Sequence, residues 1–84
     1  MPEISRFYGI IIKMYFWPSE HQPPHIHAIY QGYIIAIALN DYRAISGWLP
    51  DKAKALVIEW MKLHQTELQE MWDKQEFKKI SPLE

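Results

Sequence analysis

The residues of this 84-residue chain best suited to chemistry are its histidines, because three of the four fall between positions 21 and 27. The segment reads His21-Gln-Pro-Pro-His25-Ile-His27. Imidazole titrates near neutral pH and is the commonest metal ligand. Each proline holds its own φ at about −65° and disfavours helical backbone in the residue before it. The cluster is therefore expected on a stiff, extended segment, where it suggests either metal binding or acid–base chemistry.

Metal binding is one hypothesis for this cluster. Alternate residues of a strand point to the same face, so His25 and His27 should project together, with Cβ atoms roughly 6–7 Å apart. His21, from the preceding loop, could close over the same point. Zinc accepts imidazole nitrogen, and a catalytic zinc site has three protein ligands and one open position. His21, His25 and His27 would be the ligands of zinc or another divalent metal, with Glu20 as a fourth ligand or a base.

Acid–base catalysis on a phosphodiester, with RNA as the substrate, is a second hypothesis. One neutral and one charged histidine can remove a 2′-hydroxyl proton and protonate the leaving oxygen. His25 and His27 are the candidate pair. The cationic residues Arg6, Lys13 and Arg43 are candidates for binding the phosphate, because guanidinium and ammonium groups form charge-assisted hydrogen bonds with it.

The fourth histidine, His64, lies near the centre of an apolar helical stripe, one turn after Trp60. Buried polar side chains are generally hydrogen-bonded, and Glu67 at i+3 is on nearly the same helix face. The structural interpretation is a core histidine bonded to Glu67 or to a backbone carbonyl. The catalytic interpretation has His64 meeting His25 or His27 across a sheet–helix interface. The choice depends on which face of the second strand is turned toward the helix.

Strand-forming residues occupy the first half of the chain. The first apolar run is rich in aromatic and β-branched residues and stops at Pro18, which predicts a strand. Gln31-Gly32 predicts a two-residue hairpin turn, and Asn40-Asp41 suits a second turn. Short segments connected in this way favour an antiparallel meander of three or four strands. The predicted strands are residues 6–17, 25–30, 33–39 and 43–49.

The second half of the chain predicts one long helix over residues 50–74. Pro50 suits the first turn of a helix, and Asp51 complements the positive end of the helix dipole. Residues 76–84 are expected to form an extended tail anchored by Phe77 and Ile80. The fold class is therefore α+β, a single domain over residues 1–84. One face of the helix carries an apolar stripe, formed by Ala53, Leu56, Val57, Trp60, His64, Leu68 and Met71.

The second face of the predicted sheet is unusual, because the first and third strands are apolar on both sides. Antiparallel strands with one face in water usually alternate apolar and polar residues. One helix covers one face, so Phe7, Ile11, Tyr15 and Ile34 would form a large exposed patch on a monomer. We expect a homodimer, or a small cognate protein partner, to cover this face, unless the C-terminal tail folds back over it.

Composition excludes several classes of protein. The chain has no cysteine, which excludes disulfides and thiolate metal sites and favours a reducing compartment. Its net charge of −1 argues against a dedicated duplex-DNA binder, which usually carries a basic stripe. It has neither a run of about 18 apolar residues nor a signal-peptide pattern at its N-terminus. We therefore expect a soluble, cytoplasmic protein that does not associate with membranes.

Several motifs together resemble a bacterial family catalogued as domain of unknown function 4160. The resemblance implies a small β-meander with a helix, a cytoplasmic protein and no established activity. It also implies a neighbouring gene for a second small domain, as in a toxin–antitoxin-like pair. The family pattern often has charged residues where this chain has Ile34 and Ala36, which strengthens the expectation of a covered second face. The motifs are Met1-Pro-Glu-Ile, Arg6-Phe-Tyr-Gly, His21-Gln-Pro-Pro-His-Ile-His, Gly32-Tyr, Leu49-Pro and Glu59-Trp-Met-Lys-Leu-His64 with Glu67-Leu68.

Three functions stay open on these residues. The first is a toxin–antitoxin-like component with a nucleolytic or ligand-binding site at His25, His27 and His64. The second is a non-enzymatic interaction or regulatory module in which the histidines are structural. The third is a metal-binding protein that uses His21, His25 and His27.

Overall fold

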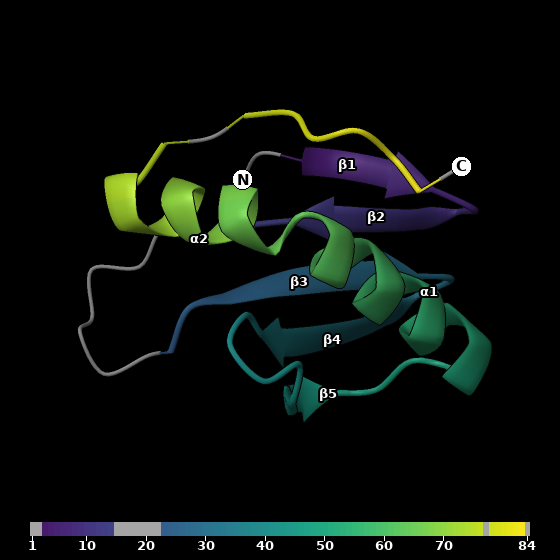
Figure 1. Ribbon diagram of the computed structural model, residues 1–84. Coiled ribbons are helices and arrows are strands. Elements are labelled where there is room, and N and C mark those ends of the chain that lie inside the picture. The colour runs from purple at the N-terminus through teal and green to yellow at the C-terminus, as the bar shows by residue number, and fades with distance from the viewer. Residues whose placement is uncertain (1–2, 15–22, 77, 84) are drawn as a thin grey trace.

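A computed structural model describes residues 3–14, 23–76 and 78–83. Within these residues, five strands form one antiparallel sheet in the order β1-β2-β3-β4-β5, and two helices follow. Both helices pack on the same face of the sheet (Figure 1). This confirms the α+β class and the antiparallel meander, but the number of strands and the single long helix were wrong. The elements are β1 Glu3–Phe7, β2 Ile10–Lys13, β3 His25–Tyr30, β4 Tyr33–Ala38, β5 Ala44–Gly47, α1 Asp51–Leu63 and α2 Gln65–Lys74.

The predicted strand over residues 6–17 is divided by a hairpin at Tyr8-Gly9. Both residues have positive φ, 50° and 78°, and Phe7 pairs directly with Ile10. A two-residue turn of this kind matches the right-handed twist of the strands that it joins. The reversal carries Phe7 to the helix-covered face, where it is buried, so its assignment to the second face was wrong. The remainder of the predicted strand, residues 15–17, lies outside the described residues.

The predicted hairpin at Gln31-Gly32 is confirmed. The two residues have φ values of 48° and 87°, and Tyr30 pairs with Tyr33 across the turn. The predicted strand over 43–49 is shorter, because β5 comprises Ala44–Gly47 and pairs with β4 through an irregular register. The sheet order puts β1 at one edge and β5 at the other.

The predicted helix is interrupted at His64, whose φ of −120° and ψ of 21° are not helical. The helix axis changes direction there, as Figure 1 shows between α1 and α2. The carbonyl of His64 still accepts a hydrogen bond from the Leu68 N–H, so α2 starts directly after the interruption. Gln65 Nε2 donates to the Leu39 carbonyl, which fixes the start of α2 to the end of β4. In the described chain, no helix has the length and apolar character required to cross a membrane.

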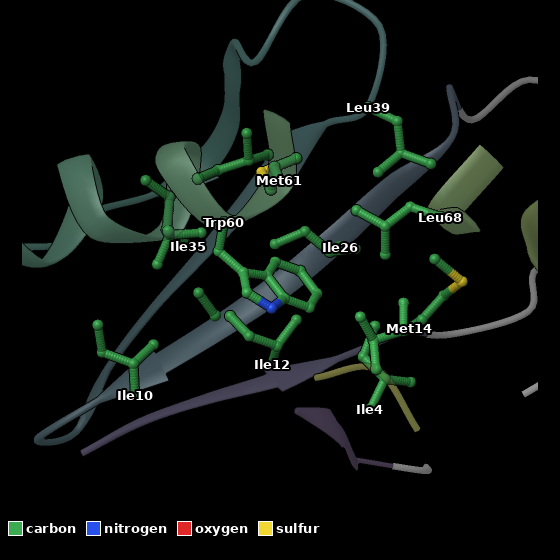
Figure 2. Close-up of a cluster of buried hydrophobic side chains, with 14 of the residues drawn as sticks. Ile4, Ile10, Ile12, Met14, Ile26, Ile35, Leu39, Trp60, Met61 and Leu68 are labelled. Atoms are coloured by element: carbon green, nitrogen blue, oxygen red, sulfur yellow. The ribbon is translucent and has the colours of Figure 1, made fainter. Parts of the chain in front are cut away.

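The hydrophobic core lies between the sheet and the two helices, with Trp60 in its middle (Figure 2). The Trp60 indole N–H donates to the Ser81 carbonyl, and the Ile80 N–H donates to the Ile4 carbonyl. The C-terminal tail therefore runs beside β1 and buries Ile80 in this core, as predicted for that residue. Phe77, its other predicted anchor, lies outside the described residues. The largest fully buried side chains are those of Ile4, Phe7, Ile10, Ile12, Met14, Ile26, Ile35, Ile37, Leu39, Leu49, Trp60 and Met61.

Candidate functional site

The two histidines of β3 point to the opposite side of that strand from the core residues Ile26 and Ala28. Ile26 and Ala28 are fully buried members of the core beneath the helices. Because alternate residues of a strand point to opposite faces, His25 and His27 belong to the other face. Their ring centroids are 5.1 Å apart, with an edge-to-face arrangement. The prediction that the two rings project together is thus consistent with the observed geometry.

The His25 ring is buried and held by two contacts. Its Nδ1 lies 2.8 Å from the Pro23 carbonyl oxygen, and its ring centroid is 5.3 Å from that of Trp72 on α2. A carbonyl oxygen only accepts hydrogen bonds, so Nδ1 carries the proton and donates it. In the neutral ring the lone pair then belongs to Nε2. The Pro23 carbonyl and the Trp72 ring therefore fix both the orientation of His25 and its tautomer.

The His27 ring is held in the neutral form. Burial is the larger cause and the nearby charge of His25 is the smaller one; together they lower the pKa of His27 to about 4. Desolvation disfavours the charged imidazolium because a buried ion loses its hydration. At neutral pH His27 is therefore a base or a ligand, and not a proton donor of the imidazolium type.

The neighbours of the pair on the adjacent strands are known from the strand register. Lys13 of β2 is opposite His27, whereas Ala36 and Ala38 of β4 are opposite His27 and His25. The two alanines are small, which leaves room above them for the imidazole rings. Both alanine side chains are buried.

The three candidate phosphate-binding cations are spread across the sheet. Lys13 is beside His27, but Arg6 is on the edge strand β1 and forms an ion pair with Glu3 at 2.8 Å. Arg43 precedes β5 at the opposite edge, and its backbone N–H bonds to the Asp41 carboxylate. The structure thus places one of the three cations next to the histidines.

His64 lies in the helical layer, at the junction of α1 and α2. Its Nδ1 is 2.9 Å from a Glu67 carboxylate oxygen, and its ring centroid is 5.4 Å from that of Trp60. This is the local hydrogen bond that the structural interpretation expected. The ring of His25 contacts Trp72 of α2 instead, so these ring contacts of the two histidines involve different residues. Its catalytic assignment stays a prediction.

The third predicted metal ligand, His21, lies outside the described residues, as does Glu20. Among the residues that are described, no three His, Cys, Asp or Glu side chains come together in a group able to hold a metal ion. The histidines that the structure does bring together are the two on β3.

Two hollows on the surface follow α2, and neither is lined by a histidine. The larger one is bordered by amide, hydroxyl and carboxylate groups from α2 and the loop after β4. The smaller one has mixed charges. Their lining residues are Asn40, Gln65, Thr66, Gln69, Glu70 and Asp73 for the larger, and Glu67, Glu70, Met71, Lys74, Glu76 and Lys78 for the smaller.

A second surface feature, which we call the β4–β5 patch, consists of Tyr33, Ile34, Ile45 and Trp48. These side chains are 46%, 53%, 37% and 56% exposed, respectively, although all are large and apolar or aromatic. The rings of Tyr33 and Trp48 meet edge to face with their centroids 4.9 Å apart. The backbone N–H of Trp48 donates to the Ile34 carbonyl. Of these four residues, the sequence had indicated an exposed position for Ile34 alone. For the others, the available signal was the position of Trp48 two residues before Pro50, at the entrance to the helix.

Comparison with known proteins gives one match. A profile for a family described as "Domain of unknown function (DUF4160)" matches residues 9–73, which is more than half of the chain. No curated protein and no solved structure matches the chain. The match includes the histidines of β3, the β4–β5 patch and most of both helices. The chain therefore belongs to the family of domain of unknown function 4160.

Proposed function

We propose that this chain is a non-enzymatic protein-interaction module whose β4–β5 patch binds a second copy of the chain. The observation that carries the proposal is the concentration of exposed apolar side chains on two neighbouring strands. Among the residues that the structure describes, four of the six exposed large hydrophobic side chains belong to this patch. Monomeric proteins rarely expose large contiguous apolar surfaces, and tryptophan and tyrosine are frequent at the centres of interfaces.

The charge of the patch favours a second copy as the occupant. None of Tyr33, Ile34, Ile45 and Trp48 carries a charge, and neither do Ser46 and Gly47 between them. A two-fold symmetric contact brings each residue near its own equivalent, so a charged patch would bring like charges together. An uncharged apolar patch has no such penalty.

The strand order supports the same occupant. The tail lies beside β1 at one edge of the sheet, whereas β5 ends the sheet at the other edge and most of its residues are exposed. An edge strand has backbone groups that can pair with another chain. Ile45 lies on this edge strand and Trp48 follows it, so a contact at the edge can bury these two side chains as well.

The nucleolytic hypothesis has weaker support from the same geometry. His64 bonds to Glu67 in the helical layer, and two of the three candidate phosphate-binding residues lie at opposite edges of the sheet. The toxin–antitoxin-like role implied by family resemblance would instead place a small cognate protein on the β4–β5 patch. That protein is the alternative occupant that the experiment distinguishes.

The proposal is tested by the molar mass of the untagged chain in solution. We expect size-exclusion chromatography with light scattering to give a dimer at micromolar concentration. Ile34→Glu should give a monomer, because two carboxylates would be desolvated in the contact. Trp48→Ala should weaken the dimer by loss of buried aromatic surface. Circular dichroism checks that each variant is folded.

Leu63→Glu is the matched control, because Leu63 is 67% exposed on α1 and outside the patch. It should leave the dimer unchanged. A wild-type chain that is monomeric at 100-fold higher concentration would contradict the second copy as occupant. If that monomer forms a defined complex with the product of a neighbouring gene, and Ile34→Glu abolishes it, the occupant is the cognate protein.

A further inference from the structure

The two imidazoles of β3 have the separation of two ligands on one metal ion. A metal–nitrogen distance of about 2.0–2.1 Å and tetrahedral angles put the centroids of two bound imidazoles roughly 5 Å apart. The observed separation of His25 and His27 is 5.1 Å. Their interplanar angle of 68° excludes a face-to-face stack.

The hydrogen bond of His25 adds an independent feature of metal ligands. Histidines that bind metals generally donate their second ring N–H to a carbonyl or carboxylate, which fixes the tautomer. His25 makes this bond from Nδ1 to the Pro23 carbonyl at 2.8 Å. Pro23 and Pro24 restrict the backbone there, so the bond comes from a stiff segment. With Nδ1 donating to this carbonyl, Nε2 of the neutral ring is the nitrogen whose lone pair can bind an ion.

The surroundings of the pair determine which ions it can take. The strand neighbours Ala36 and Ala38 carry no competing group, and the nearest titratable neighbour in the register is Lys13. Imidazole without carboxylate partners suits zinc, copper and nickel better than magnesium or calcium, which require oxygen ligands. The ammonium of Lys13 opposes a cation, so it should weaken the site rather than form it.

We propose that His25 and His27 form a two-histidine chelating site for a late first-row divalent ion such as Ni²⁺, Cu²⁺ or Zn²⁺. The site lies on the side of β3 opposite Ile26 and Ala28, where His25 also contacts Trp72 of α2. It is independent of the proposed dimer, whose patch contains neither histidine.

The test is titration of the untagged full chain, first freed of metal with a chelator, with NiCl₂ in a calorimeter. We expect one ion per chain. His27→Asn should lower the affinity for Ni²⁺ tenfold or more. Loss of a residue that only hydrogen-bonds to a metal ligand typically lowers metal affinity at least tenfold, and loss of one of two ligands should have a larger effect. Lys13→Gln should raise it a few-fold, because a repelling charge is removed.

His64→Asn is the matched control, since His64 is also next to a tryptophan and bonded to a neighbour but lies in the helical layer. It should leave the affinity unchanged. His25 is buried, so His25→Asn can perturb folding, and a second readout is needed. Cu²⁺ should quench tryptophan fluorescence, and Trp72→Phe should remove most of the quenching, because Trp72 is the indole next to His25.

The proposal is overturned if His27→Asn binds Ni²⁺ as tightly as the wild-type chain. It is also overturned if His64→Asn abolishes binding or if no ion binds at millimolar NiCl₂. The dimer is measured separately by light scattering with a chelator present. Failure of the metal site therefore leaves the proposed dimer standing, and the reverse also holds.

Discussion

Gly47 is the glycine whose replacement the backbone tolerates least. Its φ is 83°, and an added Cβ would overlap the Ile34 carbonyl oxygen and lie 2.9 Å from the Ile35 Cα. Both neighbours are backbone atoms of a central strand, so they cannot move away cheaply. Gly9 also has positive φ, but its nearest neighbour would be the Tyr30 ring at an ordinary 3.7 Å. Substitution of Gly9 therefore tests backbone strain alone, whereas substitution of Gly47 tests strain together with steric overlap.

We predict that Gly47→Ala lowers the free energy of unfolding by about 3 kcal/mol, from strain and displacement of β4 together. Gly9→Ala should cost only about 1 kcal/mol, the strain of left-handed backbone alone. Urea unfolding followed by circular dichroism measures both. If both variants lose the same free energy of unfolding, the prediction is wrong, because the overlap at Gly47 is then relieved by a local shift of the backbone.

At the scale of elements, the junction between α1 and α2 depends on a side-chain bond across the interruption. The ring of His64, before the first turn of α2, bonds to Glu67 in that turn. The bond from His64 lowers the pKa of Glu67, and Lys78 contributes a smaller effect of the same sign. A carboxylate near a helix N-terminus is also favoured by the helix dipole. The junction is therefore most stable when Glu67 is ionised.

The sign of the pH dependence follows from that lowered pKa. The unfolded carboxyl binds a proton at higher pH than the folded one, so the stabilisation is complete above about pH 4.3 and is lost as the pH falls further. Glu67→Gln should remove it. Because the Glu67 side chain is 42% exposed, we expect a difference of at most about 1 kcal/mol at pH 6, which becomes smaller as the pH falls below about 4.3. The free energies of unfolding of wild type and variant are measured by urea unfolding at each pH. A difference between them that does not change with pH would contradict the prediction.

At the scale of the whole molecule, the sheet has one face covered by helices and one face without them. The tail packs Ile80 into the core beside β1, so it contributes to the covered side. In the proposed dimer the other chain covers the β4–β5 patch. A folded state stabilised by association has a melting temperature that depends on protein concentration.

We predict that the melting temperature of the wild-type chain rises by about 3–6 °C for each tenfold increase in concentration. A tenfold increase in concentration stabilises the dimer by about 1.4 kcal/mol, and this free energy is shared between the two chains that unfold. The melting temperature of Ile34→Glu should not change with concentration, and Leu63→Glu should behave as wild type. Scanning calorimetry at three concentrations makes the measurement. A wild-type melting temperature independent of concentration would count against the dimer.

The sequence by itself determined the features that depend on local chemistry. Gln31-Gly32 between two apolar segments specified a hairpin, and the two-residue period placed His25 and His27 on a common face. The helical stripe correctly identified Val57, Trp60 and Leu68 as core residues. The same local reasoning missed Tyr8-Gly9, because that turn lies inside an unbroken apolar run with no polar residue to mark it. It also missed the interruption at His64, since the apolar period continues across it.

Only the tertiary structure decided which face of β3 is covered by the helices. Ile26 and Ala28 on one side, and His25 and His27 on the other, are both compatible with a strand, so periodicity alone cannot choose between them. The choice comes from packing, because Ile26 fits beneath Trp60 and Leu68 in the core whereas the imidazoles require polar partners. Tertiary packing likewise left Trp48 exposed, because burial depends on residues far apart in the chain.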